Sequence, residues 1–442
     1  GQKYVLQVAP EDCTGCNLCV EVCPAKDRQD PSIKAINMMS RLEHVEEEKV
    51  NYDFFLDLPE IDRNKLERID IRTSQLITPL FEYSGACSGC GETPYIKLLT
   101  QLYGDRMLIA NATGCSSIYG GNLPSTPYTT DAYGRGPAWA NSLFEDNAEF
   151  GLGFRLTVDQ HRARVMRLLE QFADKIPAEL NDALHAEAKP DVRRAQVAEL
   201  RHALQGVEGA EQLLTDADAL VEKSIWLIGG DGWAYDIGFG GLDHVLSLTE
   251  NVNILVLDTQ CYSNTGGQAS KATPLGAVTK FGEHGKRKAR KDLGVSMMMY
   301  GHVYVAQISL GAQLNQTVKA IQEAEAYPGP SLIIAYSPCE EHGYDLALSH
   351  DQMRQLTATG FWPLYRFDPR RADEGKLPLA LDSRPPSEAL AETLLQEQRF
   401  RRLNAQQPEV AEQLWRDAAA DLQKRYDFLA QLAGKAEKST SE

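Results

Sequence analysis

The chain has 442 residues, of which 43% are hydrophobic and 24% are charged, a balance typical of a soluble globular protein of roughly two to three domains. No stretch approaches the ~18 apolar residues of a membrane-spanning helix, and the first residues lack the basic and apolar regions of a signal peptide. The formal net charge of −17 argues against nucleic acid as a partner. With nine cysteines at ligand-like spacing, we expect a cytoplasmic protein whose thiols bind metal.

The first predicted element is a dense run of cysteines. Cys13, Cys16, Cys19 and Cys23, the last followed by Pro24, form C-x2-C-x2-C-x3-C-P, the bacterial ferredoxin pattern for four-iron four-sulfur clusters. The pattern predicts that the first three thiolates hold one cluster and the fourth holds another, each completed by cysteines outside this chain. A zinc site or a disulfide pair is the alternative, but zinc knuckles are normally separated by a longer loop.

This run lies in residues 1–35, which we interpret as half of a two-cluster ferredoxin-like domain. A charged connecting segment follows over residues 36–75, with a predicted helix over Asp62–Arg68. Residues 76–384 alternate short apolar runs with helical stretches, and this predicts an α/β fold with a doubly wound, mostly parallel sheet. The predicted strands are Met107–Ala110, Ile225–Ile228, Val252–Leu257, Val303–Ile308 and Leu332–Ala335.

Two further segments are predicted to be helical. Residues 155–222 are densely charged and show helical spacing in three stretches, so we expect a helical insertion between strands. These stretches are Arg162–Phe172, Ala178–Ala188 and Val192–Leu204. Residues 385–442 are predicted to form a helical C-terminal arm, either an amphipathic cap or an arm that packs on a neighbouring subunit.

A second set of cysteines lies within the α/β region. Cys87 and Cys90 form a glycine-rich C-x2-C hairpin, while Cys115 and Cys339 each follow a predicted strand. Because parallel strands bring their carboxyl ends to one edge, these four thiols are a candidate set of ligands for a complete cubane cluster. The alternative is that Cys115 and Cys339 are small buried hydrophobic residues.

A diphosphate site is predicted after the strand that ends at Ile228. Gly230-Asp231-Gly232 resembles the start of the thiamine diphosphate motif, in which an aspartate binds the magnesium ion that bridges the diphosphate. Thr259 stands where a second oxygen ligand is expected, and the carbonyl of Cys261 is a candidate third. Asp236 and Asp258 are competing carboxylates, each with an alternative role as a helix cap. A dinucleotide-binding loop is disfavoured because G-x-G-x-x-G is absent after this strand.

Together these blocks resemble the carboxyl-terminal part of pyruvate:ferredoxin (flavodoxin) oxidoreductase over about residues 1–345. The specific pieces are the ferredoxin run, Ala-Cys-Ser-Gly-Cys-Gly-Glu, Ala-Thr-Gly-Cys-Ser-Ser-Ile-Tyr-Gly-Gly-Asn, Gly-Asp-Gly-Trp-Ala-Tyr-Asp-Ile-Gly and Tyr-Ser-Asn-Thr-Gly-Gly-Gln. The resemblance implies that residues 76–384 are a thiamine diphosphate-binding domain. It also implies oxidative decarboxylation of pyruvate with coenzyme A to acetyl-CoA and CO2, with electrons passing through 4Fe-4S clusters to ferredoxin or flavodoxin.

The resemblance also implies roles for individual residues. Cys87, Cys90, Cys115 and Cys339 become ligands of the cluster nearest thiamine, and Asp231, Thr259 and the Cys261 carbonyl become Mg²⁺ ligands. The implied thiamine contacts are Glu92, Cys115 and the segments 230–233 and 259–264, among them Gly230, Asp231, Gly232, Trp233, Thr259, Cys261 and Asn264. Asn264 is additionally implied to lie near the reacting carbonyl as a catalytic residue.

Parts of this family are missing from the chain. The glutamate that activates thiamine, the pyruvate-binding arginine, the coenzyme A domain and the first ferredoxin run have no counterpart here. We therefore expect an amino-terminal part of the same enzyme as partner, as a separate segment or chain, and a homodimer of the full enzyme. Two alternatives stay open: a sister 2-oxoacid:ferredoxin oxidoreductase, and an electron-transfer subunit with a vestigial thiamine site.

Overall fold

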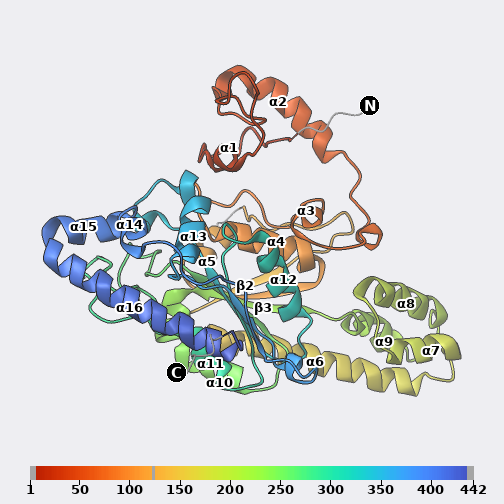
Figure 1. Ribbon diagram of the computed structural model, residues 1–442. Coiled ribbons are helices and arrows are strands. Elements are labelled where there is room, and N and C mark those ends of the chain that lie inside the picture. The colour runs from red at the N-terminus through yellow and green to blue at the C-terminus, as the bar shows by residue number, and fades with distance from the viewer. Residues whose placement is uncertain (1–5, 122–124, 436–442) are drawn as a thin grey trace.

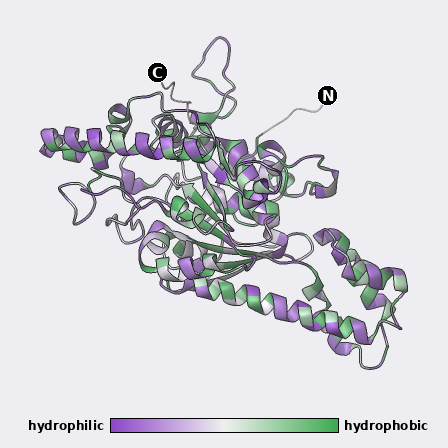
Figure 2. Cartoon of the chain, turned by 60° about the horizontal axis from the view of Figure 1, so that its bottom comes forward, coloured by the Kyte–Doolittle hydropathy of each residue, from purple (hydrophilic) through white to green (hydrophobic). Residues whose placement is uncertain are grey.

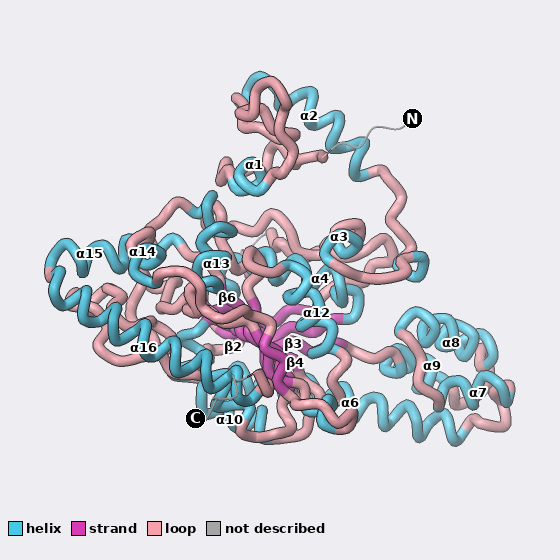
Figure 3. Tube along the Cα trace, in the orientation of Figure 1, coloured by secondary structure: helices cyan, strands magenta, loops and turns pink. Residues whose placement is uncertain are grey.

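A single mixed sheet forms the centre of the molecule in the computed structural model, which describes residues 6–121 and 125–435 (Figures 1 and 3). Within these residues eight strands are ordered β2-β1-β3-β4-β6-β5-β7-β8. The strands from β2 to β5 in this order run parallel, while β7 and β8 add an antiparallel edge. Their bounds are β1 Met107–Ala112, β2 Ala138–Ser142, β3 Ser224–Gly230, β4 Asn253–Asp258, β5 Tyr304–Ile308, β6 Ser331–Tyr336, β7 Tyr365–Phe367 and β8 Leu379–Leu381.

The doubly wound, mostly parallel sheet predicted from sequence is confirmed. Its central strands are apolar on both faces because helices cover both sides, and they are the greenest part of Figure 2. Within β3, Ile225 and Leu227 face one core while Trp226 and Ile228 face the other. All five predicted strands are present, each within two residues of its predicted ends.

The helices of the main body flank the sheet (Figure 3). One face is covered in part by α4 and α12, whose buried side chains share a core with Trp226 and Ile228. The opposite core includes side chains of α10, α11, α13 and the C-terminal helices. The bounds of these body helices and of two short ones are α3 Ile71–Ser74, α4 Thr93–Tyr103, α5 Cys115–Gly120, α10 Phe239–Ser247, α11 Leu293–Met298, α12 Leu314–Glu325 and α13 Ser349–Ala358.

The first part of the chain stands at the edge of the body, as the red lobe of Figure 1. It contains α1 (Leu18–Val22), within the cysteine run, and a long helix, α2 (Arg41–Leu56). The prediction of a helix over Asp62–Arg68 is wrong, because only a 3-10 turn, Arg63–Lys65, forms there. The helix of the connecting segment is α2, which has no buried residue and therefore no apolar stripe to reveal it. The first five residues of the predicted ferredoxin-like segment lie outside the described part.

The helical insertion is confirmed as an arm beside the sheet (Figure 1). It comprises α6 (Asn147–Gln171), α7 (Ala178–His185), α8 (Pro190–Ala203) and α9 (Glu211–Asp216). Its helices enclose a core of their own, which includes Val165, Leu200 and Leu213. The first turns of α6 pack on the sheet instead, so the helix joins the arm to the body. None of the helices in the described residues has the length and apolarity needed to cross a membrane.

The C-terminal segment is helical, as predicted, and caps the body. It comprises α14 (Leu390–Leu394), α15 (Gln398–Gln406) and α16 (Pro408–Leu432). Leu403, Trp415 and Leu429 are buried in the core on one face of the sheet. Contact of this arm with a neighbouring subunit stays a prediction, and residues 436–442 lie outside the described part.

Candidate active site

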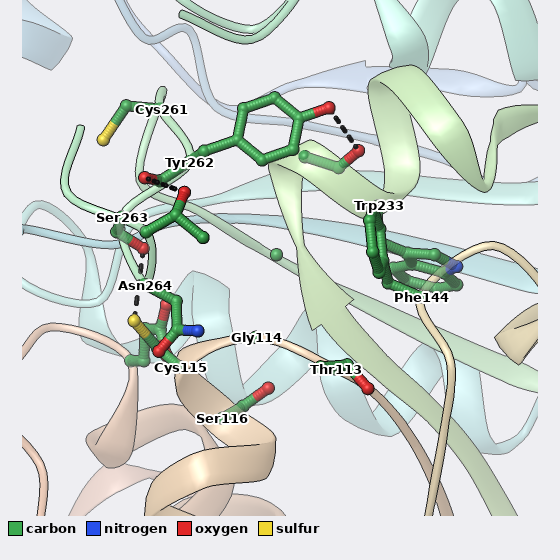
Figure 4. Close-up of a pocket in the computed structure, with 14 residues that line it drawn as sticks. Thr113, Gly114, Cys115, Ser116, Phe144, Trp233, Cys261, Tyr262, Ser263 and Asn264 are labelled. Atoms are coloured by element: carbon green, nitrogen blue, oxygen red, sulfur yellow. Dashed lines mark hydrogen bonds between the residues drawn. The ribbon is translucent and has the colours of Figure 1, made fainter. Parts of the chain in front are cut away.

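A pocket lies at the carboxyl ends of the neighbouring strands β1 and β3. The connection after β1 leads to β2 on one side of the sheet, and the connection after β3 leads to β4 on the other side. Open α/β sheets bind ligands at such a point, where the two connections diverge. The pocket has a cavity volume of about 120 Å³, and Figure 4 shows the loop from Cys261 to Asn264 opposite Trp233 and Phe144. Its lining residues are Glu92, Thr113, Gly114, Cys115, Ser116, Phe144, Gly230, Gly232, Trp233, Cys261, Tyr262, Ser263, Asn264 and Thr265.

The three predicted magnesium ligands lie together behind this pocket. The hydroxyl of Thr259 is 3.0 Å from Oδ1 of Asp231 and 3.1 Å from the backbone oxygen of Cys261. The backbone N–H of Thr259 also donates to Oδ1 of Asp231, at 3.2 Å. The loops after β3 and β4 thus bring a carboxylate, a hydroxyl and a carbonyl to one point, and oxygen ligands of these kinds suit Mg²⁺.

The two competing carboxylates already have cationic partners. Asp258 is fully buried and pairs with Arg290 at 2.8 Å, while Asp236 pairs with Lys271 at 2.6 Å. Asp231 forms no salt bridge within the described residues, although it is fully buried. Burial, and then the negative charge of Asp258, raise the pKa of Asp231 above its usual range. Of the three carboxylates, Asp231 therefore has the greatest need of a cation.

Of the two glycines beside Asp231, Gly232 is required by close packing and Gly230 is not. A Cβ at Gly232 would lie 2.5 Å from the ring of Tyr262, whose hydroxyl donates to the Gly232 carbonyl at 3.4 Å. A Cβ at Gly230 would meet nothing closer than 3.9 Å, so this position leaves open space at the pocket wall. The chain from Gly232 to Ile237 then forms a π-helical turn, a feature frequent at functional sites.

Four of the cysteines lie at the same edge of the sheet. The Cys87–Cys90 hairpin is fastened to the loop after β6, because Gly91 donates its N–H to the Pro338 carbonyl at 2.9 Å. A Cβ at Gly91 would lie 2.3 Å from Pro338, so the residue before Cys339 packs directly on the hairpin. Cys115 begins α5 and lies 3.3 Å from the Ser263 hydroxyl (Figure 4).

Electrostatic interactions link these thiols. Burial chiefly raises the pKa values of Cys87, Cys90 and Cys115, and the charge of Cys339 contributes to all three. A hydrogen bond with the Cys261 thiol, together with burial, raises the pKa of Cys339. No three His, Cys, Asp or Glu side chains in residues 6–121 and 125–435 are grouped to hold a single metal ion. Four thiolates that each bind a different iron of a cubane are not such a group, so the ligand set stays a prediction.

Glu92 is an acidic group in the pocket wall. It accepts a hydrogen bond from the Tyr119 hydroxyl at 3.0 Å, and it is almost fully buried. Burial raises its pKa to about 7, against the lowering effect of the Tyr119 bond. Glu92 therefore holds a proton more readily than an exposed glutamate does. Asn264 lines the same pocket, so the structure brings both residues to the predicted thiamine site.

The ligand roles of the ferredoxin-type cysteines, and their division between two clusters, stay a prediction. Burial, and then the thiols of Cys16 and Cys13, raise the pKa of Cys19. Cys23 lies at the C-cap of α1, and a backbone hydrogen bond from Ala25 to its sulfur chiefly lowers its pKa. Cys19 thus interacts with Cys16 and Cys13, while Cys23 interacts with other groups.

Several site residues were not predicted from sequence. Ser270 donates to Oδ2 of Asp231 at 2.5 Å, and Arg399 reaches Gln260 from the C-terminal arm. Tyr119 contacts Glu92. Ser270 and Arg399 come from segments without a recognisable spacing, whereas Tyr119 lies inside a block already singled out.

Comparison with known proteins agrees with these two kinds of site. Residues 6–26 match a family model described as a 4Fe-4S binding domain. Residues 202–335 match one described as thiamine pyrophosphate enzyme, C-terminal TPP binding domain, and these residues include Asp231, Thr259 and Cys261. Thiamine pyrophosphate is thiamine diphosphate under another name. Thiamine diphosphate and iron–sulfur clusters are thus the cofactors that the sequence families support.

Relatives of known name match over nearly the whole chain. The chain is 92% identical to the probable pyruvate-flavodoxin oxidoreductase of Escherichia coli K12, over 100% of its own length and 38% of the relative. The chain matches the carboxyl-terminal part of the pyruvate-flavodoxin oxidoreductases. A putative pyruvate-flavodoxin oxidoreductase of Synechocystis is 55% identical over 97% of this chain and 37% of its own length. The pyruvate:ferredoxin oxidoreductase of Moorella thermoacetica is 48% identical over 98% and 38%.

The match to pyruvate-flavodoxin oxidoreductases confirms the resemblance seen in the sequence motifs. The chain spans about 38% of the length of these relatives, so most of each relative has no counterpart in it. This partial coverage agrees with the expectation that the activating glutamate, the pyruvate-binding arginine and the coenzyme A domain belong to another part of the enzyme.

Proposed function

We propose that this chain is the part of a pyruvate:ferredoxin (flavodoxin) oxidoreductase that holds thiamine diphosphate and passes electrons to iron–sulfur clusters. The complete protein, meaning this chain together with the amino-terminal part found in its relatives, would convert pyruvate and coenzyme A to acetyl-CoA and CO2. The observation that carries this proposal is the convergence of Asp231, Thr259 and the Cys261 carbonyl beside a pocket lined by Cys115. A metal–diphosphate site and a candidate cluster ligand therefore share one wall.

The residues present fit magnesium. Asp231 is a buried carboxylate without a salt bridge among the described residues, and its neighbours Thr259 and Cys261 offer neutral oxygens. Hard divalent cations of small radius prefer this donor set, completed by phosphate oxygens. Gly230 leaves room for phosphate to approach the backbone.

Thiamine diphosphate, when bound, supplies an electron sink for the carbanion formed when a 2-oxoacid loses CO2. The chain's own residues orient and shield that chemistry. Trp233 and Phe144 form an apolar wall, as Figure 4 shows, and Asn264 offers an amide to a reacting carbonyl from the opposite wall. Glu92, with its raised pKa, is placed to share a proton with a polar group of the cofactor.

The position of the thiols supports electron transfer as part of the function. Cys115 lines the pocket, and the Cys87–Cys90 hairpin lies next to the ferredoxin-like segment. Ser88 of the hairpin contacts Thr14, with 3.3 Å between the hydroxyl oxygens. Two of the proposed cluster sites, the one that includes Cys87 and Cys90 and the one of Cys13, Cys16 and Cys19, are thus neighbours, in an order that leads away from the pocket. Flavodoxin or ferredoxin is the proposed acceptor, a homodimer the proposed assembly, and the cytoplasm the proposed location.

The test is made on the complete protein. We expect pyruvate-dependent reduction of flavodoxin or ferredoxin that requires coenzyme A, together with one thiamine diphosphate for each copy of this chain. Reduction with 2-oxoglutarate and not with pyruvate would favour a sister 2-oxoacid enzyme. Electron transfer without bound thiamine diphosphate would identify an electron-transfer subunit with a vestigial site. Either result would overturn the proposal.

A further inference from the structure

Gln260 adopts an unusual backbone conformation between two of the proposed magnesium ligands. Its φ is +62°, in the left-handed region that glycine adopts freely and residues with a side chain avoid. Gln260 is fully buried, so its side chain does not relax toward solvent. This conformation turns the chain between Thr259 and Cys261 and brings the Cys261 carbonyl within 3.1 Å of the Thr259 hydroxyl. Surrounding contacts must therefore hold a conformation that the residue itself disfavours.

Three hydrogen bonds hold Gln260 in this turn. Its N–H donates to Oδ1 of Asp258 at 3.1 Å, and its carbonyl accepts from the Thr273 hydroxyl at 2.6 Å. Its side-chain oxygen accepts from Nη2 of Arg399 at 2.7 Å. The first bond comes from the end of β4 and the second from the loop that contains Thr273, whereas the third comes from the start of α15 in the C-terminal arm. The C-terminal arm is therefore connected to the turn at Gln260 by a buried side-chain contact.

Arg399 is itself held rigidly. Its Nε donates to Glu397 at 2.6 Å, and both side chains are buried. Glu397 accepts a further bond from Gln352 at 2.8 Å, and the carbonyl of Arg399 accepts from the N–H of Val278 at 2.9 Å. The guanidinium has two directed donors in use, one for Glu397 and one for Gln260. This fork geometry is specific to arginine, so lysine is a poor substitute for it.

We infer that Arg399 is a positioning residue for the proposed magnesium–thiamine diphosphate site: it holds Gln260 in the left-handed turn that directs the Cys261 carbonyl toward Asp231 and Thr259. This inference rests on the proposed function, because it assigns the turn a task only if the three oxygens bind metal. A purely structural role for the Arg399–Glu397 pair makes a different prediction. In that case the contact with Gln260 affects folding stability, and the affinity for the cofactor is unchanged.

Substitutions at position 260 separate the two roles. Gln260→Ala removes the contact with Arg399 and keeps the strain, so we expect the affinity of the complete protein for thiamine diphosphate with Mg²⁺ to fall at least tenfold by calorimetry. Gln260→Gly removes the same contact but adopts positive φ without strain, so it should recover most of that loss. A purely structural role predicts that both variants bind the cofactor as wild type does, with the loss confined to the free energy of unfolding.

Arg399→Lys completes the series as a double-mutant cycle. Lysine keeps the positive charge beside Glu397 but cannot donate to Glu397 and Gln260 at once as the guanidinium does. We therefore expect weaker cofactor binding in the wild-type background. In the Gln260→Gly background the same change should have little further effect, because the turn no longer needs to be held. Arg416→Lys is the matched control, since Arg416 is exposed on α16 and pairs with Glu412. It should bind the cofactor as wild type does.

Asp231→Asn, measured in the same titration, distinguishes failure of the inference from failure of the proposed function. If Asp231→Asn binds weakly while Gln260→Ala and Arg399→Lys bind as wild type, the positioning role of Arg399 is overturned and the site stands. If Gln260→Gly binds thiamine diphosphate no more tightly than a weakened Gln260→Ala does, Arg399 does not act by holding the left-handed turn. If Asp231→Asn binds as wild type, the proposed metal site is wrong and the inference falls with it.

Discussion

Cys16 of the ferredoxin-like segment lies against Gly89 of the Cys87–Cys90 hairpin: a Cβ at Gly89 would be 3.7 Å from the Cβ of Cys16. Gly89 has a φ of +77°, and the same Cβ would lie 2.9 Å from the Cβ of Leu346. The contact between the two proposed cluster sites is thus made by a residue that has neither the backbone conformation nor the space for a side chain.

Gly89→Ala should therefore disturb both stability and electron transfer. A side chain in the left-handed region costs about 1–2 kcal/mol, and the contact with Leu346 forces the hairpin to move. We expect a lower free energy of unfolding, measured with denaturant, and slower reduction of flavodoxin or ferredoxin by the complete protein.

Gly134→Ala is the control for this change. Gly134 has a similar φ of +73°, but a Cβ there would have no neighbour within 4 Å among the described residues. It should show the conformational cost without any effect on electron transfer. Equal electron-transfer rates in the two variants would mean that the Gly89 contact has no part in the path.

Cys339→Ser should remove one cluster from the complete protein. If Cys87, Cys90, Cys115 and Cys339 hold a cubane, the variant should lose about four iron atoms per chain, measured together with acid-labile sulfide. Cys261→Ser should keep its iron, since only the carbonyl of Cys261 is assigned to a metal. The reverse pattern would make Cys261, which hydrogen-bonds Cys339, the true fourth ligand.

Two glycines of α6 should respond to alanine in opposite directions. A Cβ at Gly151 would lie 2.3 Å from Cγ of Leu227 in β3, whereas a Cβ at Gly153 would have open space. Gly151→Ala should overpack the interface and cost about 1–3 kcal/mol. Gly153→Ala should stabilise the helix by about 0.5–1 kcal/mol, because alanine loses less backbone entropy. Thermal unfolding measures both, and two shifts of the same sign would contradict this packing of α6 on the sheet.

The parts of the fold that sequence predicted are those with a strong local pattern. Runs such as Val252–Leu257 are apolar on both faces and bounded by polar residues, so they indicate buried parallel strands. β2 was missed because Ala138–Ser142 contains alanine, asparagine and serine, which carry little strand signal. β7 and β8 have three residues each, too few for a period to show.

The same limit applies to the site. Asp231, Thr259 and Cys261 were predicted because they follow strands within recognisable blocks, and the structure brings them together. Arg399 was missed because its role depends on tertiary packing of the C-terminal arm against Gln260. The positive φ of Gln260 had no signal either, since glycine or asparagine is the usual mark of a left-handed turn.

The most direct test of the account is a calorimetric titration of the complete protein with thiamine diphosphate and Mg²⁺. Asp231→Asn removes the one carboxylate of the proposed site, and Asp236→Asn is the control, because Asp236 is already paired with Lys271. We predict that Asp231→Asn weakens binding at least tenfold and that Asp236→Asn binds as wild type does. Unchanged affinity in Asp231→Asn, or a loss confined to Asp236→Asn, would contradict the assignment of the metal site.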